Sequence, residues 1–299
     1  MISRDQLRGT GTALATPFKQ DGSIDFEAFH KLINYSIDGG VEYLVVLGTT
    51  GETPTLDLDE KKALIEFTFK ATDGKLPIVI GVGGNNTQAV IKEIESLPLH
   101  DAVAILSANP YYNKPSQEGI YQHYKTIAEA SPKPLILYNV PGRTGSNMAA
   151  ATTLRLSEVP NIIGIKEASG DMKQCMQLIR DKPKDFLVVS GDDHLAFPLI
   201  ALGMDGVISV ASNCFPKDFS EMVRAALDGN LVSARLIHNQ LMECFDLLFV
   251  ENNPAGLKAF LTELNIIDNY LRLPLVPLSE NIHRQVREYL KKGEEEVEG

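Results

Sequence analysis

The sequence predicts an α/β fold, a closed (β/α)8 barrel, followed by a C-terminal α-helical extension. Eight short aliphatic runs recur along the chain, and stretches of helical periodicity separate them. The runs are apolar at consecutive positions, which is typical of parallel strands buried on both faces. Eight such units in series favour a barrel. An open doubly wound sheet is the alternative, but it needs a glycine-rich turn after its first strand, and Thr16-Pro17-Phe18 stands there instead.

The eight predicted strands cover residues 11–15, 43–47, 77–80, 102–106, 135–138, 162–165, 186–189 and 206–209. Amphipathic helices are predicted between them. Phe29, Leu32 and Ile33 share one face of a helix over 25–39, and Leu64 and Ile65 do so in a helix over 57–72.

The strand-like runs stop near residue 227. Leu241, Phe245 and Leu248 recur at helical spacing in a predicted helix over 231–249, and Pro254 can open another helix at its first turn. A third helix is predicted over 278–292. We therefore expect a barrel over 1–227, a helical domain over 228–292 and an acidic, disordered tail over 293–299.

The composition disfavours some classes of binding partner and indicates where the protein is located. The 28 Lys and Arg residues against 39 Asp and Glu residues give a net charge of −11, which disfavours nucleic acid and anionic membranes as partners. Cys175, Cys214 and Cys244 are odd in number and widely spaced, which indicates a reducing compartment. No apolar segment suits a signal peptide or a membrane span, so we expect a cytoplasmic protein.

In a barrel of this kind the chemistry lies at the C-terminal ends of the strands. The second predicted strand is followed there by a glycine-flanked pair of hydroxyls, Thr49 and Thr50. Such a turn can present backbone N–H groups and hydroxyls to a carboxylate. An ordinary hydroxyl-rich turn is the alternative.

The ends of the fifth and sixth strands carry the most informative residues. Tyr138 ends the fifth strand, Arg143 follows in a Pro/Gly loop, and Lys166 ends the sixth strand. Partial desolvation at a barrel mouth favours the neutral amine of a lysine, which can attack a carbonyl carbon. A tyrosine can transfer protons, and an arginine fork fits a carboxylate. Each residue taken alone also has a purely structural explanation. Tyr138 could be a packed aromatic, Arg143 a surface charge, and Lys166 a lysine paired with an acid. Because strands five and six are neighbours, Tyr138 and Lys166 can share one cavity, which favours a carbonyl-condensing enzyme.

Other candidates are weaker. Asp192-Asp193-His194 follows the seventh strand and could suggest a metal site, but no second ligand cluster accompanies it. The run over 81–86 lacks the third glycine of a dinucleotide fingerprint. Tyr111 and Tyr112 form an aromatic pair in a loop, which is more typical of packing or an interface. We expect no cofactor and no metal.

Four motifs together resemble a known family. They are Gly-Thr-Thr-Gly-Glu at 48–52, Asn-Pro-Tyr-Tyr-Asn-Lys-Pro-Ser-Gln-Glu-Gly at 109–119, Tyr-Asn-Val-Pro-Gly-Arg-Thr-Gly at 138–145 and Gly-Ile-Lys-Glu-Ala-Ser-Gly at 164–170. The chain resembles the dihydrodipicolinate (4-hydroxy-tetrahydrodipicolinate) synthase family from about residue 9 to residue 277. This family belongs to the class I pyruvate-dependent aldolase/lyase superfamily with a TIM-barrel fold, which also includes N-acetylneuraminate lyase. Arg143 favours the synthase, because the sialic acid lyase lacks an arginine in this loop.

The resemblance implies a lyase that condenses pyruvate with L-aspartate 4-semialdehyde, the first committed step of lysine and diaminopimelate biosynthesis. Lys166 would form a Schiff base with pyruvate, and Tyr138 would transfer protons through Thr49 to Tyr112. The tyrosine that matches Tyr112 comes from a neighbouring subunit in this family, whose usual state is a homotetramer, a dimer of dimers.

The resemblance also implies binding residues. Thr50, Thr49 and the Ile208 backbone would seat the pyruvate carboxylate, Arg143 would engage the carboxylate of the aldehyde, and Gly191 would keep the pocket open. Two alternatives stay open: a lyase or aldolase acting on a sialic acid or a keto-deoxy sugar acid, and a non-catalytic barrel that binds a keto acid.

One departure from the family concerns feedback control. Members inhibited by L-lysine commonly carry a histidine and a glutamate in an interface pocket, near the positions of Leu58, Lys61 and Ala89 here. Asn85 and Tyr111 are retained. A lysine ligand would lack its acidic partner and meet Lys61, so we expect weak or absent inhibition.

Overall fold

The computed structural model describes residues 4–298, and within them eight parallel strands close a barrel in the order of the chain. The strands are β1 Gly9–Ala13, β2 Tyr43–Val46, β3 Ile78–Gly81, β4 Ala104–Ala108, β5 Leu135–Asn139, β6 Ile162–Glu167, β7 Leu187–Ser190 and β8 Gly206–Ser209. The predicted fold class, a TIM barrel with C-terminal helices, is confirmed.

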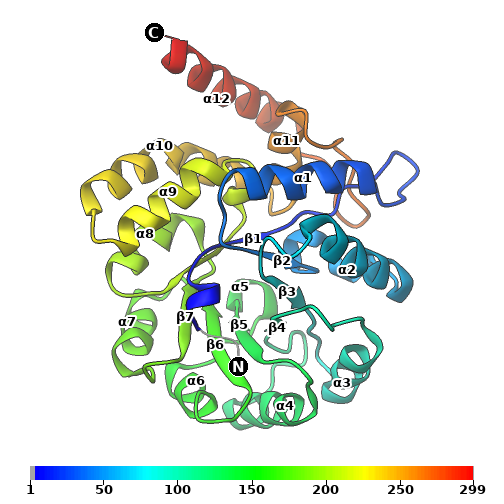
Figure 1. Ribbon diagram of the computed structural model, residues 1–299, viewed down its shortest axis with the longest axis vertical. Helices are drawn as coiled ribbons and strands as arrows, with labels where there is room; N and C mark the ends of the chain where they lie inside the picture. The colour runs from blue at the N-terminus through cyan, green and yellow to red at the C-terminus, as the bar shows by residue number, and fades with distance from the viewer. Residues whose placement is uncertain (1–3, 299) are drawn as a thin grey trace.

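Helices surround the barrel and extend beyond it (Figure 1). They are α1 Phe26–Asp38, α2 Leu58–Thr72, α3 Thr87–Ser96, α4 Gln117–Ala130, α5 Pro141–Thr144, α6 Ala150–Leu156, α7 Met172–Asp181, α8 Asp193–Ala201, α9 Pro216–Leu227, α10 Leu231–Phe249, α11 Ala255–Glu263 and α12 Glu280–Glu298. Short 3-10 helices lie at Arg4–Leu7, Thr49–Gly51, Thr53–Thr55 and Ala211–Asn213.

The consecutive apolar residues of each strand serve two cores. On β2, Val45 belongs to the apolar cluster inside the barrel, whereas Leu44 and Val46 belong to the larger cluster between strands and helices. Successive side chains of a strand point to opposite faces, so a strand buried on both faces has apolar residues throughout. This explains why the runs were recognisable in the sequence.

Seven of the eight strands begin or end one or two residues from their predicted limits, and β1 and β4 show why. β1 begins at Gly9, two residues before the prediction, because Gly9 pairs with Gly206 of β8. A Cβ on Gly206 would lie 2.0 Å from the Gly9 carbonyl oxygen, so the strands can approach there only without side chains. β4 continues to Ala108 past the buried Ser107, a polar position that the apolar pattern does not include.

Of the C-terminal helices, α10 packs against helices that surround the barrel, whereas α12 projects away from it. α10 packs against α8 and α9, and α11 packs against α10. Pro254 is the residue before α11, not its first helical residue. Figure 1 shows α12 projecting away from the barrel. α12 is helical to Glu298 and so includes most of the segment predicted as a tail; the disorder of 293–299 stays a prediction, and Gly299 lies outside the described residues.

Among residues 4–298, no helix combines the length and the apolar character that a membrane span requires.

Candidate active site

Tyr138 and Lys166 lie against each other inside the barrel mouth. They are directly paired in the register of β5 and β6, and the Lys166 Nζ atom is 4.4 Å from the centroid of the Tyr138 ring. Lys166 is 5% exposed and Tyr138 is 7% exposed. The structure therefore brings together the two residues that the sequence placed at neighbouring strand ends.

Gly191 follows β7 and leaves room for the lysine side chain. A Cβ at this position would lie 2.8 Å from the Lys166 Cε and 2.7 Å from the Ala168 Cβ. Contacts this short would force the lysine side chain to shift. Gly191 thus lies against the Lys166 side chain, and its expected role of keeping the pocket open stays a prediction.

The Thr49–Gly51 turn is a 3-10 helix at the end of β2. Thr50 is buried, and its Oγ1 accepts a hydrogen bond from the Asn253 side-chain amide at 3.0 Å. Leu47, two residues before the turn, and Glu52, directly after it, have left-handed backbones with φ of 60° and 53°. Side chains rarely adopt this conformation unless the surroundings hold it, so the turn has a defined shape.

Asn253 joins two of the predicted binding residues, although the sequence analysis did not single it out. It is 4% exposed and comes from the segment between α10 and α11. Its side chain donates to Thr50, and its backbone carbonyl accepts from the Arg143 Nη2 at 3.3 Å. Asn253 is about 200 positions from Thr50 in the chain, so no local pattern marks it.

A cavity of about 520 Å³ opens at the C-terminal ends of the strands. Thr49, Tyr138 and Arg143 line one part of it, and Lys61 and Glu93 line another. The cavity size falls in the range of small-molecule sites.

Ile208 and Tyr112 lie differently with respect to this site. Ile208 is buried in the same apolar cluster inside the barrel as Tyr138. Tyr112 is 87% exposed and has a left-handed backbone with φ of 70°. Ile208 therefore lies in the barrel interior, and the binding role of its backbone stays a prediction, whereas the Tyr112 side chain is exposed to solvent on its own chain.

Behind the paired Tyr138 and Lys166, the next residues of β5 and β6 form a polar network. Asn139 donates to both oxygens of the Glu167 carboxylate, at 3.2 and 3.1 Å, and Gln174 donates to Glu167 Oε2 at 3.0 Å. Glu167 and Asn139 are buried. These bonds fix the ends of both strands, because a buried carboxylate needs all its acceptors satisfied.

The Asp192-Asp193-His194 segment has structural partners. Asp192 caps the N-terminus of α8, Asp193 Oδ2 accepts from the backbone N–H groups of Val210 and Ala211, and His194 pairs with Asp246. Burial raises the pKa of Asp193 above its usual value. Within residues 4–298, no three His, Cys, Asp or Glu side chains gather as a possible metal site.

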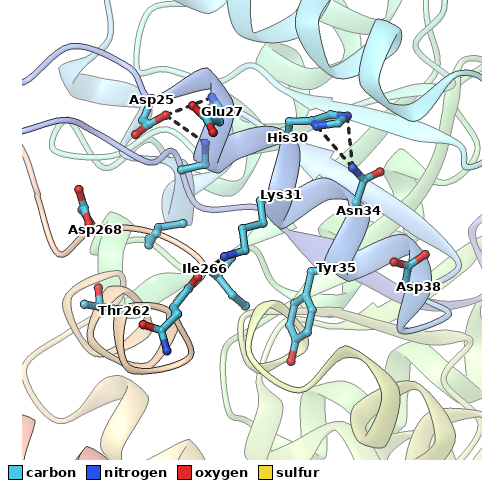
Figure 2. Close-up of a pocket in the computed structure, with 13 residues that line it drawn as sticks. Asp25, Glu27, His30, Lys31, Asn34, Tyr35, Asp38, Thr262, Ile266 and Asp268 are labelled. Carbon is cyan, nitrogen blue, oxygen red and sulfur yellow. Dashed lines mark hydrogen bonds between the residues drawn. The ribbon is translucent and has the colours of Figure 1, made fainter.

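A second concave region, of about 820 Å³, lies outside the barrel between α1 and the segment after α11 (Figure 2). Several of its polar groups have partners within the chain. Asp25 caps α1, and Lys31 donates to the Asn265 carbonyl. The residues predicted from the sequence to act on substrate do not line it.

The model of the dihydrodipicolinate synthetase family matches residues 6–293. A 4-hydroxy-tetrahydrodipicolinate synthase from Parabacteroides distasonis is 54% identical over 286 residues, which cover 95% of this chain and 96% of that protein. Seven further relatives with the same name are 46% to 52% identical.

Solved structures of dihydrodipicolinate synthases superpose on nearly the whole chain. A chloride-inhibited dihydrodipicolinate synthase from Acinetobacter baumannii, complexed with pyruvate, superposes with a TM-score of 0.93 at 42% identity, covering 95% of this chain and 98% of that chain. A monomeric dihydrodipicolinate synthase variant superposes with a TM-score of 0.94 at 42% identity, covering 96% and 97%. These names favour the synthase over the sugar-acid lyase and the non-catalytic barrel, and they confirm the function predicted from the four motifs. The chain belongs to the dihydrodipicolinate synthetase family, whose members compared here are named 4-hydroxy-tetrahydrodipicolinate synthases.

Proposed function

We propose that this protein condenses pyruvate with L-aspartate 4-semialdehyde through a Schiff base on Lys166. The observation that carries the proposal is the buried pair of Lys166 and Tyr138, with the amine 4.4 Å from the ring centroid. An amine next to a proton donor is the arrangement that imine formation requires.

The first half of the reaction takes place on Lys166. The neutral amine adds to the keto carbon of pyruvate to give a carbinolamine, and loss of water gives a protonated imine. The imine withdraws electrons, so the methyl carbon loses a proton and an enamine forms. Tyr138, beside the amine, carries protons to and from these intermediates. Thr49 at the cavity wall continues the proton path toward Tyr112 of a neighbouring subunit.

Thr50, Thr49 and the Ile208 backbone hold the pyruvate carboxylate. The buried Thr50 hydroxyl, fixed by Asn253, lies in a turn with a defined backbone. Such a turn orients its N–H groups and hydroxyls before the substrate binds, and the entropy cost of binding is then lower.

In the second half, the enamine carbon attacks the aldehyde carbon of L-aspartate 4-semialdehyde. Arg143, on α5 at the wall of the cavity, engages the carboxylate of this substrate with its planar fork. The amino group of the condensed product then displaces Lys166 by attack on the imine carbon. Cyclisation thereby releases the product and regenerates the free amine.

We also propose that the protein assembles as a homotetramer, although a solved relative is a monomeric variant. Two separate surfaces support assembly. Tyr111 and Tyr112 are exposed beside the active-site cavity, and Leu202, Val232 and Leu236 are exposed along the ends of α8 and α10. Exposed apolar groups of this kind mark contact surfaces. A reducing, cytoplasmic location is supported by the three cysteines, which are buried and free.

The test of the Schiff base is trapping with borohydride. Wild-type protein incubated with pyruvate and reduced should gain one pyruvate-derived group on Lys166, located by peptide mass spectrometry. The Lys166→Ala variant should gain none, and Lys173→Ala, which removes an exposed lysine of α7, should behave as wild type. An adduct that persists in Lys166→Ala would refute the proposal. Competition between L-aspartate 4-semialdehyde and a sugar aldehyde during turnover of the unreduced enzyme separates the synthase from the sugar-acid lyase.

A further inference from the structure

A fully buried ion pair joins the helical extension to the turn that holds the pyruvate carboxylate. Lys258 of α11 and Glu52, at the end of the Thr49–Gly51 turn, have side chains that are 0% exposed, and the Lys258 Nζ lies 2.5 Å from the Glu52 Oε1. We propose that Lys258, acting through Glu52, is a positioning residue that sets the substrate-binding shape of the Thr49–Gly51 turn. This inference rests on the proposed function.

Glu52 is coupled to the turn through its backbone. Its N–H donates to the Thr49 carbonyl at 3.1 Å, and its own carbonyl accepts from the Thr55 N–H and hydroxyl, both at 2.9 Å. The left-handed φ of 53° is disfavoured for a glutamate and persists only where contacts hold it. A change in how the Glu52 side chain is held therefore acts directly on the position of Thr49.

The extension supplies the contacts that hold the Glu52 side chain. Besides the ion pair, Glu52 Oε2 accepts from the Arg272 backbone N–H at 3.0 Å. The Lys258 ammonium also donates to the Tyr270 carbonyl at 2.8 Å and lies 4.3 Å from the centroid of the Phe18 ring. Both charges thus have partners from residues far apart in the chain.

Burial makes this pair sensitive to the loss of either partner. Desolvation lowers the pKa of Lys258 to about 8, even though Glu52 favours the charged form. Removing one member of a buried pair leaves an uncompensated charge, whereas removing both members costs much less stability. Stability and turn geometry can therefore be separated by comparing single and double variants.

The Lys258 ammonium is fully buried against Glu52, the Tyr270 carbonyl and the Phe18 ring, so its link to the Thr49–Gly51 turn runs through Glu52. If Lys258 only stabilises the fold, the pyruvate KM should return to the wild-type value when the urea midpoint of unfolding is restored. A positioning role predicts a raised pyruvate KM that persists when stability is restored.

The experiment compares Lys258→Met, Glu52→Gln and the double variant. Steady-state KM for each substrate, kcat and the urea midpoint of unfolding are measured for all three. Both single variants should lose stability. The double variant should recover most of the urea midpoint but keep a pyruvate KM raised about fivefold or more, with the aldehyde KM changed less than about twofold.

Lys31→Met is the matched control, because Lys31 also links a barrel helix to the extension through the Asn265 carbonyl but lies outside the barrel (Figure 2). This control should leave the pyruvate KM unchanged. A double variant with a wild-type pyruvate KM would overturn the inference. This comparison of the double variant with wild type remains decisive even if a single variant does not fold. Borohydride trapping on wild-type protein separates the two proposals: without an adduct on Lys166 the proposed function fails, whereas an adduct with unaltered KM in the double variant refutes the positioning role alone.

Discussion

Lys166 and Tyr138 meet because two neighbouring parallel strands present them in register. Their neighbours in the chain, Glu167 and Asn139, point to the opposite side of the sheet and hydrogen bond to each other. One face of the strand pair therefore carries the two groups proposed to react, and the other face carries the bonds that keep the strand ends fixed.

Replacement of Tyr138 by phenylalanine tests its role in proton transfer. Tyr138→Phe keeps the ring against Lys166 and removes only the hydroxyl. We expect the pyruvate adduct to form at saturating pyruvate, with kcat lowered about 10²- to 10⁴-fold, the range of general acid–base catalysis. Steady-state assays and borohydride trapping measure both quantities. A turnover close to that of wild type would refute the assigned role.

His123, a buried residue of α4, links stability to pH. Its Nδ1 lies 2.9 Å from the Thr87 hydroxyl, and burial lowers its pKa from 6.5 to about 4. In the unfolded chain this histidine binds a proton below about pH 6.5, but in the folded protein it does so only near pH 4. Stability is therefore complete above pH 6.5 and falls as the pH decreases toward 4.

We expect the free energy of unfolding from urea titrations to fall by about 2 kcal/mol more between pH 7 and pH 5 in wild type than in His123→Gln. The glutamine variant is neutral at both pH values and isolates this residue from His238, whose pKa burial also lowers. Equal losses in both proteins would show that His123 does not contribute.

At the scale of secondary-structure elements, α2 and α3 decide the polarity of the outer part of the active-site cavity. Lys61 of α2 and Glu93 of α3 form an ion pair at 2.7 Å and both line the cavity. From the sequence, an L-lysine ligand is expected to lack an acidic partner for its ammonium group and to meet Lys61 instead. The structure adds the acidic group, Glu93, but Lys61 already neutralises it.

L-lysine is therefore expected to inhibit weakly or not at all. Binding of its ammonium group would require the Lys61–Glu93 pair to open while Lys61 repels the ligand. Steady-state assays with L-lysine titrated against both substrates measure this directly. Inhibition at micromolar concentrations would contradict the prediction.

The extension is the element that couples distant parts of the chain. Between α10 and α12 it places Asn253 on Thr50 and Arg143, and Lys258 on Glu52. The helices after the barrel are thus in contact with the turns that form the site. Because these contacts cross the proposed domain boundary, we expect neither part to retain the site geometry alone.

At the scale of the whole molecule, Tyr112 distinguishes a complete site from an incomplete one. It is exposed on the single chain, and the proposed proton path needs it in a neighbouring subunit. Mixed oligomers test this. Lys166→Ala and Tyr112→Phe subunits are each expected to be nearly inactive, but hybrids contain sites with both Lys166 and a partner's tyrosine.

Activity should rise when the two variants are co-expressed, because some sites in each hybrid are then intact. Native mass spectrometry confirms that hybrids have formed, and mixing either variant with itself is the control. Hybrids without recovered activity would show that Tyr112 does not act across subunits.

The sequence by itself determined the barrel and the residues at its strand ends. Eight buried strands leave apolar runs because both faces need apolar side chains, and Lys166, Tyr138 and the Thr49-Thr50 pair follow such runs directly. These are local signals, so their order along the chain also predicts that they share one end of the barrel.

Only the tertiary structure decided which residues support that site. Asn253, Lys258 and Glu93 carry no local pattern that assigns them to it, and the start of β1 at Gly9 is set by pairing with Gly206 of β8 and not by an apolar run. Periodicity reports which face of an element is buried, whereas closure of the barrel and docking of the extension set contacts over some 200 residues of chain. Hence the sequence could predict that Lys166 and Tyr138 lie at neighbouring strand ends, but it could not predict the contacts that hold them in place.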